Sequence, residues 1–328
     1  MNRFTPAAFA AAFGGLAALA MAPAPAAAFP TQPVTIIVPY TAGGATDLLA
    51  RRAADLLTPV LGQSVVVENR PGAGATLGTT LAARARPDGH TLYMGQVSSH
   101  GIAPAVYDEL QYDALGDFTP LRLMMTIPNV MVVNAEFPAD DVAGFVEVAR
   151  ERRTTFASSG TGSSIHLSGE MFKSMLDLDM THVPYRGSGE AVPALLSGDV
   201  DVMFDNLPSA LPQIQAGGLK ALAVTTPERS PSLPDVPTLQ ETGIDELAGF
   251  AAMSWFGLLT QSRVPEDRVA VLQQAIDQIM EDPEMLTFID NRGGDVGRYS
   301  GPDFTAFIES ELALWAEVVE AAGVQLDP

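Results

Sequence analysis

The sequence has 328 residues, of which 47% are hydrophobic and 17% are charged, and its formal net charge is −21. The length predicts about two domains, and so acidic a surface disfavours nucleic acid as a partner because it repels phosphate backbones. The absence of cysteine excludes disulfides, thiolate nucleophiles and cysteine metal sites.

The N-terminal segment has the pattern of a secretory signal peptide. Arg3 precedes an apolar, alanine-rich run at residues 7–22, and Ala26 to Ala28 give the small-x-small pattern that signal peptidase requires. The run is too short and too rich in alanine for a membrane-spanning helix. We therefore expect residues 1–28 to be a signal peptide that is cleaved after Ala28, and the mature protein to be periplasmic.

Strands and helices alternate in the next part of the chain. Residues 34–38 form a continuous apolar run, as expected for a strand that is buried on both faces. Residues 47–61 carry an apolar stripe that predicts a helix, and Gly62 ends it. This alternation predicts a parallel sheet flanked by helices, and it continues with a strand at 65–68, a Gly-rich turn, a helix to about 85 and a strand at 91–94.

A second series begins after Pro128. Its strands are predicted at 130–133, 154–159, 181–185, 200–204 and 219–226, with helices between them. A proline-rich loop at 227–237 then leads into a mainly helical end. The sequence therefore predicts an α/β fold of two lobes joined by crossing strands. Lobe I begins at residues 29–128, lobe II spans 129–249, and residues 250–328 return to lobe I and end in helices.

Two loops lie between a predicted strand and the start of a helix, where such sheets bind ligands. In the first, residues 39–47, Gly43 and Gly44 allow close approach of a ligand, and the helix N-terminus favours a carboxylate or phosphate. Asp47 either caps this helix or contacts the ligand. The second loop, residues 156–166, combines hydroxyls and glycines that can donate hydrogen bonds to an anion; the alternative is a flexible linker.

Two further loops are candidates for the same site. After the strand at 200–204, Asn206 can donate to a ligand oxygen and Asp205 can accept from a hydroxyl or ammonium, unless the segment is a simple turn. Residues 94–101 offer Gln96 and several hydroxyls as weaker candidates.

Several segments of the sequence closely resemble the substrate-binding receptors of tripartite tricarboxylate transporters, also called the Bug family. They cover nearly the whole mature chain and are VTIIVPYTAGGATDLLAR, VVVENRPGAGATLGTTLAARARPDGHTLYMG, FASSGTGSSIHLSGEMFK, HVPYRGSGEAVPALLSGDVDVMFDNLPS and LKALAVTTPERSPSLPDVPTLQETG. The resemblance implies the type II periplasmic binding protein fold, in which each lobe is a mainly parallel sheet flanked by helices. It also implies a small carboxylate ligand and delivery of that ligand to integral membrane transporter subunits.

The resemblance also implies which residues bind the ligand. One departure from the family pattern is Thr41-Ala42, where the family usually has two prolines. We expect a monomer that needs no cofactor, no metal and no catalytic group. The expected ligand-binding residues are Tyr40, Ala42, Gly43, Gly44, Asp47 and Gln96 in lobe I, and Ser159, Thr161, Ser163, Ser164, Asp205 and Asn206 in lobe II.

Other functions remain as alternatives. A periplasmic serine esterase or hydrolase would use Ser164 with His166, although the chain has no GxSxG elbow. No HExxH motif indicates a metal site. Residues 72–78 read GxGxxxG rather than the dinucleotide-binding GxGxxG, and a tight turn explains those glycines. A solute sensor would use the same site as a transport receptor.

Overall fold

The computed structural model describes Met1 and residues 29–322. Apart from Met1, the predicted signal peptide lies outside the described residues. None of the described helices is long and apolar enough to cross a membrane.

The first part of lobe I has the predicted strand and helix alternation. Helix α1 begins two residues before the predicted start and ends before Gly62, which adopts the left-handed conformation (φ 65°) that glycine allows. The elements in order are β1 (Val34–Val38), α1 (Ala45–Leu61), β2 (Val65–Asn69), the 3-10 turn η1 (Ala73–Ala75), α2 (Thr76–Ala83), β3 (Thr91–Gln96), the π-helix η2 (Ser98–Ile102) and α3 (Ala103–Val106).

Lobe II contains the second series. Its elements are the last part of β4 (Phe118–Asn134), α4 (Val142–Glu151), β5 (Thr154–Ser158), α5 (Ser164–Met175), β6 (Met180–Pro184), α6 (Ser188–Ser197), β7 (Val202–Asn206), α7 (Leu207–Gln215), β8 (Leu219–Val224) and the 3-10 turns η3 (Leu239–Thr242) and η4 (Asp245–Leu247). The chain then returns to lobe I through β9 (Met253–Gln261), α8 (Glu266–Met280), α9 (Pro283–Asp290), β10 (Asp295–Val296) and α10 (Pro302–Ala322).

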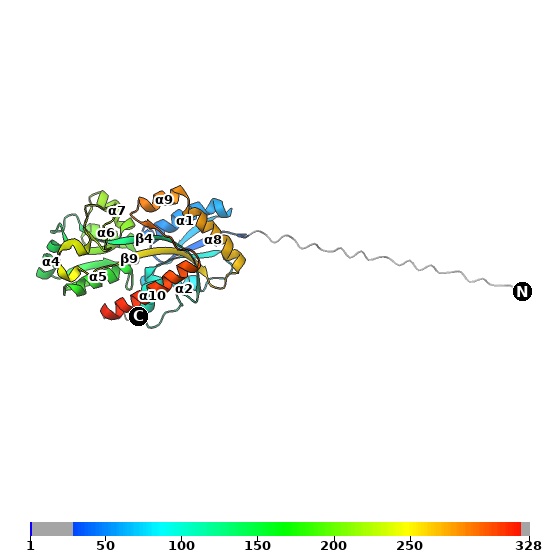
Figure 1. The fold of residues 1–328 in the computed structure, drawn as a ribbon, viewed down its shortest axis with the longest axis horizontal. Helices are drawn as coiled ribbons and strands as arrows, with labels where there is room; N and C mark the ends of the chain where they lie inside the picture. Colours follow the sequence, from blue (N-terminus) through cyan, green and yellow to red (C-terminus); the bar gives the residue numbers. More distant parts are fainter. Residues whose placement is uncertain (2–28, 323–328) are drawn as a thin grey trace.

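Two long strands, β4 and β9, join the lobes. They pair antiparallel from Phe118 to Pro128 of β4, and the rest of β4 pairs with β7 and β8 in lobe II. Figure 1 shows the two strands side by side through the middle of the molecule. The sheet order is β2-β1-β3-β9-β4-β7-β5-β6, in which β1, β2 and β3 are parallel in lobe I, and β5, β6 and β7 in lobe II. Each lobe therefore has a mixed sheet. The crossing strand runs antiparallel to its neighbour, β9 to β3 in lobe I and β4 to β7 in lobe II.

The crossing strands are where the sequence prediction was least complete. Only residues 130–133 of β4 were predicted as strand, and β9 was not predicted at all. Pro120 and Pro128 lie within β4, and register shifts between Pro120 and Arg122 and between Leu123 and Met125 accommodate the irregular backbone. In β9, a Cβ at Gly257 would lie 2.3 Å from the Phe304 ring, so this glycine lets α10 pack on the strand.

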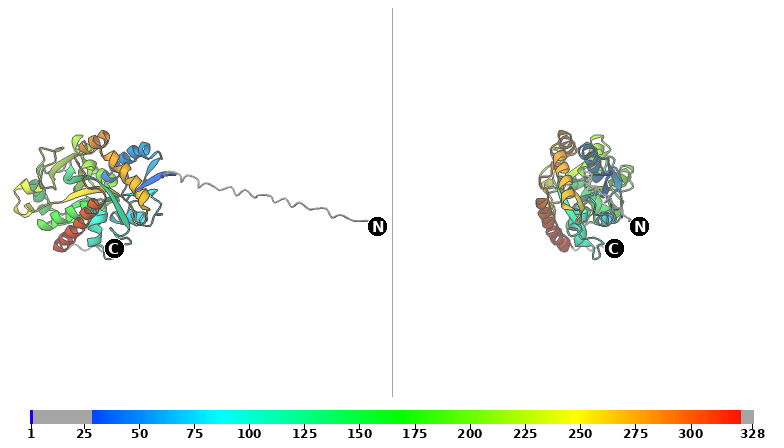
Figure 2. Two further views of the ribbon diagram at one scale, coloured as in Figure 1. Left: turned by 45° about the vertical axis from the view of Figure 1, so that its right-hand side comes forward. Right: turned by 90° about the vertical axis from the view of Figure 1, so that its right-hand side faces the viewer.

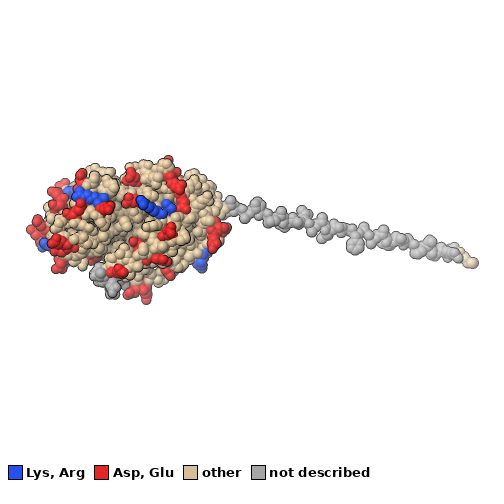
Figure 3. Space-filling model, viewed as in Figure 1, with Lys and Arg blue, Asp and Glu red and all other residues tan. Residues whose placement is uncertain are grey.

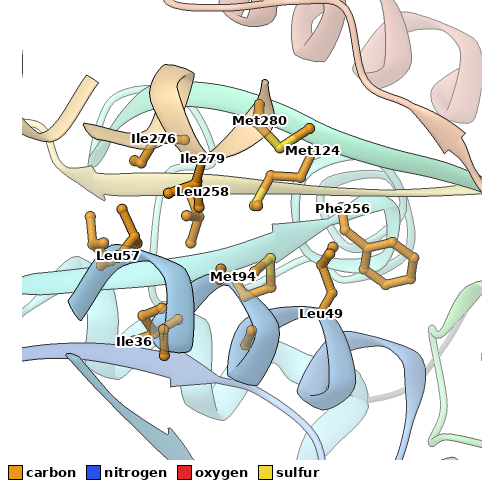
Figure 4. Packing of buried hydrophobic residues seen from close by; sticks show 14 of the residues in the cluster. Ile36, Leu49, Leu57, Met94, Met124, Phe256, Leu258, Ile276, Ile279 and Met280 are labelled. Atoms are coloured by element: carbon orange, nitrogen blue, oxygen red, sulfur yellow. The ribbon is translucent and has the colours of Figure 1, made fainter. Parts of the chain in front are cut away.

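Hydrophobic clusters cover both faces of each sheet. In lobe I, α1 and α8 pack Leu49, Leu57 and Ile276 against the strand residues Met94 and Leu258 on one face (Figure 4). On the other face, α2, α3 and α10 pack around Trp255, Phe304 and Trp315. The two views of Figure 2 show helices on both sides of the strands. This packing leaves the strand ends that face the opposite lobe free for the loops between the lobes.

Candidate functional site

The first helix of lobe I begins without a side-chain cap. Its N-cap is Gly44, and the first intrahelical bond runs from the Leu48 N–H to the Gly44 carbonyl. The N–H groups of Thr46 and Asp47 therefore have no partner within the helix. Gly43, with φ of 90°, takes a conformation that favours glycine. The loop thus turns free N–H groups, at the positive end of the helix dipole, toward lobe II.

Asp47 holds this loop in place from inside the protein. Its side chain is 2% exposed, and it accepts hydrogen bonds from the Gly43 N–H (2.9 Å), the Arg51 guanidinium (2.9 Å) and the Asn69 amide (2.9 Å). Burial alone would raise the pKa of Asp47, but these three hydrogen bonds and the positive charge of Arg51 lower it below the usual value. Asp47 therefore acts as a support of the loop.

Replacing Asp47 by alanine is expected to destabilise the protein by roughly 2 kcal/mol, because the Gly43 N–H, the Asn69 amide and the Arg51 guanidinium lose a buried carboxylate that accepts from all three. Ligand affinity should fall as well, since the loop loses its anchor. Chemical denaturation and calorimetric titration measure the two effects. Asp55→Ala, an exposed change on the same helix, is the control. Unchanged stability in Asp47→Ala would contradict the supporting role.

The Ser/Gly loop of lobe II leads into α5 in the same way. Ser163 is the N-cap, and its Oγ accepts from the His166 N–H at 3.1 Å. The imidazole of His166 in turn accepts from the Gly162 N–H at 3.2 Å. Because the Ser163 hydroxyl uses a lone pair for the cap, its proton remains available to a ligand. The N–H of Ile165, in the first turn, also has no partner within the helix.

Gln96 contributes a buried donor from the end of β3. Its side chain is 3% exposed, and its Nε2 has no hydrogen-bond partner among the described residues. An unpaired buried amide costs roughly 1–3 kcal/mol. Tyr40 lies on the same side; burial raises the pKa of its phenol to about 12, so the hydroxyl stays protonated. Both groups can donate to an anion.

Two more helices of lobe II begin at the same place. Ser188, the first residue of α6, donates its hydroxyl to Asp205 Oδ1 at 2.5 Å. Asn206, the N-cap of α7, donates its amide to Asn129 Oδ1 (2.6 Å) and to Ser254 Oγ (2.9 Å). Asp205 is fully buried, and burial raises its pKa to about 7 despite hydrogen bonds from Ser188 and the Asn206 backbone.

These groups enclose one small cavity between the lobes. Four helix N-termini, those of α1, α5, α6 and α7, reach it, and their dipoles make it attractive to anions. None of the described residues that line it is charged, so the attraction depends on N–H and O–H donors. The lining residues are Tyr40, Gly44, Ala45, Thr46, Gln96, Ser159, Ser163, Ser164, Ile165, Ser188 and Asn206.

The lobes are closed around this cavity. Its volume is about 10 Å³, room for about one water molecule, so the lobes must separate to admit a larger solute. Hydrogen bonds join the two lobes across the cleft. The first of those given below uses the Thr41 N–H, which a proline at this position would lack. These bonds are Thr41 N–H to Arg186 O (3.3 Å), Ala45 N–H to Ser209 Oγ (2.9 Å), Tyr107 O–H to Thr161 O (2.8 Å) and Ser164 N–H to Ser98 Oγ (3.0 Å).

The structure separates the residues expected at the site into two groups. Those that line the cavity are Tyr40, Gly44, Gln96, Ser159, Ser163, Ser164 and Asn206, and those that lie behind it or beside it are Ala42, Gly43, Asp47, Thr161 and Asp205. Sequence reasoning missed Ala45, Thr46, Ile165 and Ser188 in the lining. The Gly187-Ser188-Gly189 run at the start of α6 has the same glycine and hydroxyl pattern as the two loops that were singled out.

The side chains required for the hydrolase alternative are not paired in this structure. Ser164 Oγ contacts Ser254 Oγ at 2.9 Å, and His166 faces Gly162 and Glu170. A Ser158–His182 pair exists at 2.6 Å, but Ser158 is fully buried and outside the cavity lining. Burial also lowers the pKa of His182 to about 3, which makes it a poor base at neutral pH.

Comparison with known proteins gives this geometry its context. The family model described as "Tripartite tricarboxylate transporter family receptor" matches residues 49–324. The chain belongs to this receptor family. Protein BugT of Bordetella pertussis is 33% identical to the receptor over 309 residues, which cover 93% of this chain and 94% of BugT.

Solved structures agree with the assignment. An R. palustris protein with adipate is 34% identical and has a TM-score of 0.85, covering 90% of the receptor and 98% of that chain. MatC from Rhodopseudomonas palustris, with bound malate, is 35% identical with a TM-score of 0.83, covering 89% and 100%. The predicted two-lobed periplasmic binding protein fold is therefore confirmed, and the protein is a solute-binding receptor of the tripartite tricarboxylate transporter family.

Proposed function

We propose that this receptor captures a small carboxylate in the cavity between its lobes and carries it to the membrane subunits of a tripartite tricarboxylate transporter, without altering it. The observation that carries the proposal is the convergence of four helix N-termini on a cavity with an unpaired donor, Gln96 Nε2, and no charged side chain among its described lining residues. Such donors bind carboxylates at hydrogen-bond distance even where the net charge of the protein is negative.

We infer the following binding cycle. Lobe I, residues 29–128 with the return segment 250–328, and lobe II, residues 129–249, rotate about β4 and β9. The ligand carboxylate bridges the N-termini of α1 and α5, in part through water.

The mature chain begins at Phe29 after cleavage behind Ala28, and it acts as a periplasmic monomer. Its surface has acidic side chains on both lobes and few basic ones on the face in Figure 3, which disfavours nucleic acid.

Thermal unfolding of the mature protein with a panel of organic acids, amino acids and neutral solutes tests the function. A ligand at about 100 times its dissociation constant should stabilise by about 2.7 kcal/mol, and it should be recovered unchanged after incubation. If neutral or cationic solutes stabilise the protein and no acid does, the carboxylate assignment is wrong. Recovery of a chemically altered ligand would contradict a purely binding role.

Gln96→Leu tests the site separately from the fold. Because the Gln96 amide nitrogen has no partner among the described residues, removing the amide should leave stability unchanged or raise it by about 1 kcal/mol. The same change should weaken carboxylate binding about tenfold, the effect of losing one hydrogen bond to a charged group. Gln274→Leu, on the exposed face of α8, is the matched control. Equal affinity in Gln96→Leu and in the control would show that the ligand binds elsewhere.

A further inference from the structure

The hydrogen-bonding groups around the cavity are not evenly distributed. On the lobe I side, the unpaired Gln96 amide, the protonated Tyr40 phenol and the Thr46 N–H are all donors. These groups suit the oxygens of a carboxylate. The N-terminus of α5, with the Ile165 N–H, adds another donor from lobe II.

One corner of lobe II has the opposite character, and we call Ser188 and Asn206 the acceptor corner. A serine hydroxyl has one proton and two lone pairs. When Asp205 is ionised it can only accept, so the Ser188 proton is then committed to Asp205 Oδ1 at 2.5 Å and only lone pairs remain for the cavity. The Asn206 amide nitrogen is committed to Asn129 and Ser254, which leaves its oxygen as the group without a partner among the described contacts.

The hydrogen bond between Ser188 and Asp205 is well protected. Ser188 is 6% exposed and Asp205 is fully buried, so water does not compete for the Ser188 proton. Asp205 lies outside the cavity lining, and it acts by fixing the direction of the Ser188 hydroxyl. The acceptor corner is therefore a fixed feature of the closed cavity above about pH 7, where Asp205 is ionised.

An acceptor without a donor opposite it is unfavourable once the lobes close, because an unpaired buried polar group costs roughly 1–3 kcal/mol. The ligand must then supply a donor as well as a carboxylate. A hydroxyl fits better than an ammonium, since Ser188 and Asn206 lie at the N-termini of α6 and α7, where a positive charge is unfavourable.

We propose that Ser188, oriented by Asp205, and Asn206 make this receptor selective for hydroxycarboxylic acids over the same acids without the hydroxyl. This inference rests on the proposed carboxylate-binding function and specifies its ligand class. Ser188 and Asn206 determine specificity by accepting the hydroxyl hydrogen bond, while the donors of α1, α5 and Gln96 hold the carboxylate.

Calorimetric titration with acids that differ by one hydroxyl tests the proposal. The pairs are malate and succinate, lactate and propionate, and citrate and tricarballylate. In each pair of which a member binds, the hydroxy acid should bind at least about tenfold more tightly, because the hydroxyl pairs a group that otherwise stays unpaired. Equal affinities within the pairs overturn the selectivity and leave the carboxylate receptor intact. Binding of no member of any pair contradicts the proposed function itself.

Ser188→Ala identifies the residue responsible. Without the acceptor, the preference for the hydroxy acid should fall to less than about threefold, while affinity for the deoxy acid changes by less than about threefold. Ser197→Ala, at the exposed end of the same helix, is the matched control and should keep the full preference. A full preference in Ser188→Ala overturns the assignment to this residue. If Ser188→Ala does not fold, the wild-type ratios alone decide the proposal.

Discussion

Replacing Gly189 by alanine is expected to abolish tight ligand binding while leaving the protein folded. In the closed structure, a Cβ at this position would lie 2.0 Å from the carbonyl oxygen of Ala42, across the cleft. That atom belongs to the backbone, so it cannot move aside as a flexible side chain would. The φ of Gly189 is not in the left-handed region, and alanine in the first turn of α6 is itself favourable by up to about 1 kcal/mol.

Ligand affinity in Gly189→Ala should therefore fall at least about 100-fold, since the lobes cannot reach the arrangement in which both hold the ligand. Small-angle scattering should show that the radius of gyration no longer decreases when ligand is added. Gly249→Ala is the matched control, because an exposed Cβ there has no neighbour within 4 Å. Wild-type affinity in Gly189→Ala would mean that the ligand is bound in a more open arrangement.

Asp205 should make the stability of the receptor fall as pH rises. Burial raises its pKa from 3.8 to about 7, so between these values the folded protein keeps a proton that the unfolded chain has lost. Stability from this group is full below pH 3.8 and decreases until the carboxyl ionises near pH 7. The penalty reaches about 4 kcal/mol above that pH, of which about 3 kcal/mol develops between pH 5 and pH 8.

Asp205→Asn removes this titration and keeps an oxygen that can accept from Ser188. Relative to wild type, the variant should gain about 3 kcal/mol of unfolding free energy between pH 5 and pH 8. Denaturant titrations at several pH values measure this difference, and taking the difference cancels the contributions of other carboxylates. Asp199→Asn, an exposed aspartate after α6, should show no such trend. A difference that stays constant with pH would mean that Asp205 ionises normally in the folded protein.

The sequence was most informative where local rules decide the structure. The apolar stripe and Gly62 defined α1 to within two residues, because helix periodicity and a left-handed glycine act locally. The crossing strands were harder to predict. Pro120, Pro128 and Gly257 are poor strand residues. A register shift follows Pro120, Pro128 lies where β4 ends its pairing with β9 and begins pairing with β7, and Phe304 packs against Gly257 of β9.

The candidate site shows a similar limit. Glycine and hydroxyl runs before helices led to loops that line the cavity in the structure, but they do not reveal which atoms the protein itself already pairs. The sequence left Asp47 open between a helix cap and a ligand contact, and in the structure three internal donors occupy its carboxylate. Gln96 looked like a weak candidate, yet its amide is left unpaired beside the cavity. These outcomes depend on residues such as Asn69 that are distant in sequence.

The serine hydroxyls across the cleft have a consequence for signalling to the membrane. Ser209 and Ser98 each accept a hydrogen bond from the first N–H group of a helix of the opposite lobe, α1 and α5 respectively. Because these bonds join protein groups to protein groups, they stabilise the closed arrangement independently of a solute, and closure alone does not report that a solute is bound. A transporter that responded only to closure would therefore also respond to unloaded receptors. Transport of the solute then depends on the ratio of loaded to unloaded receptors among the closed ones. The free energy that solute binding adds to closure sets this ratio.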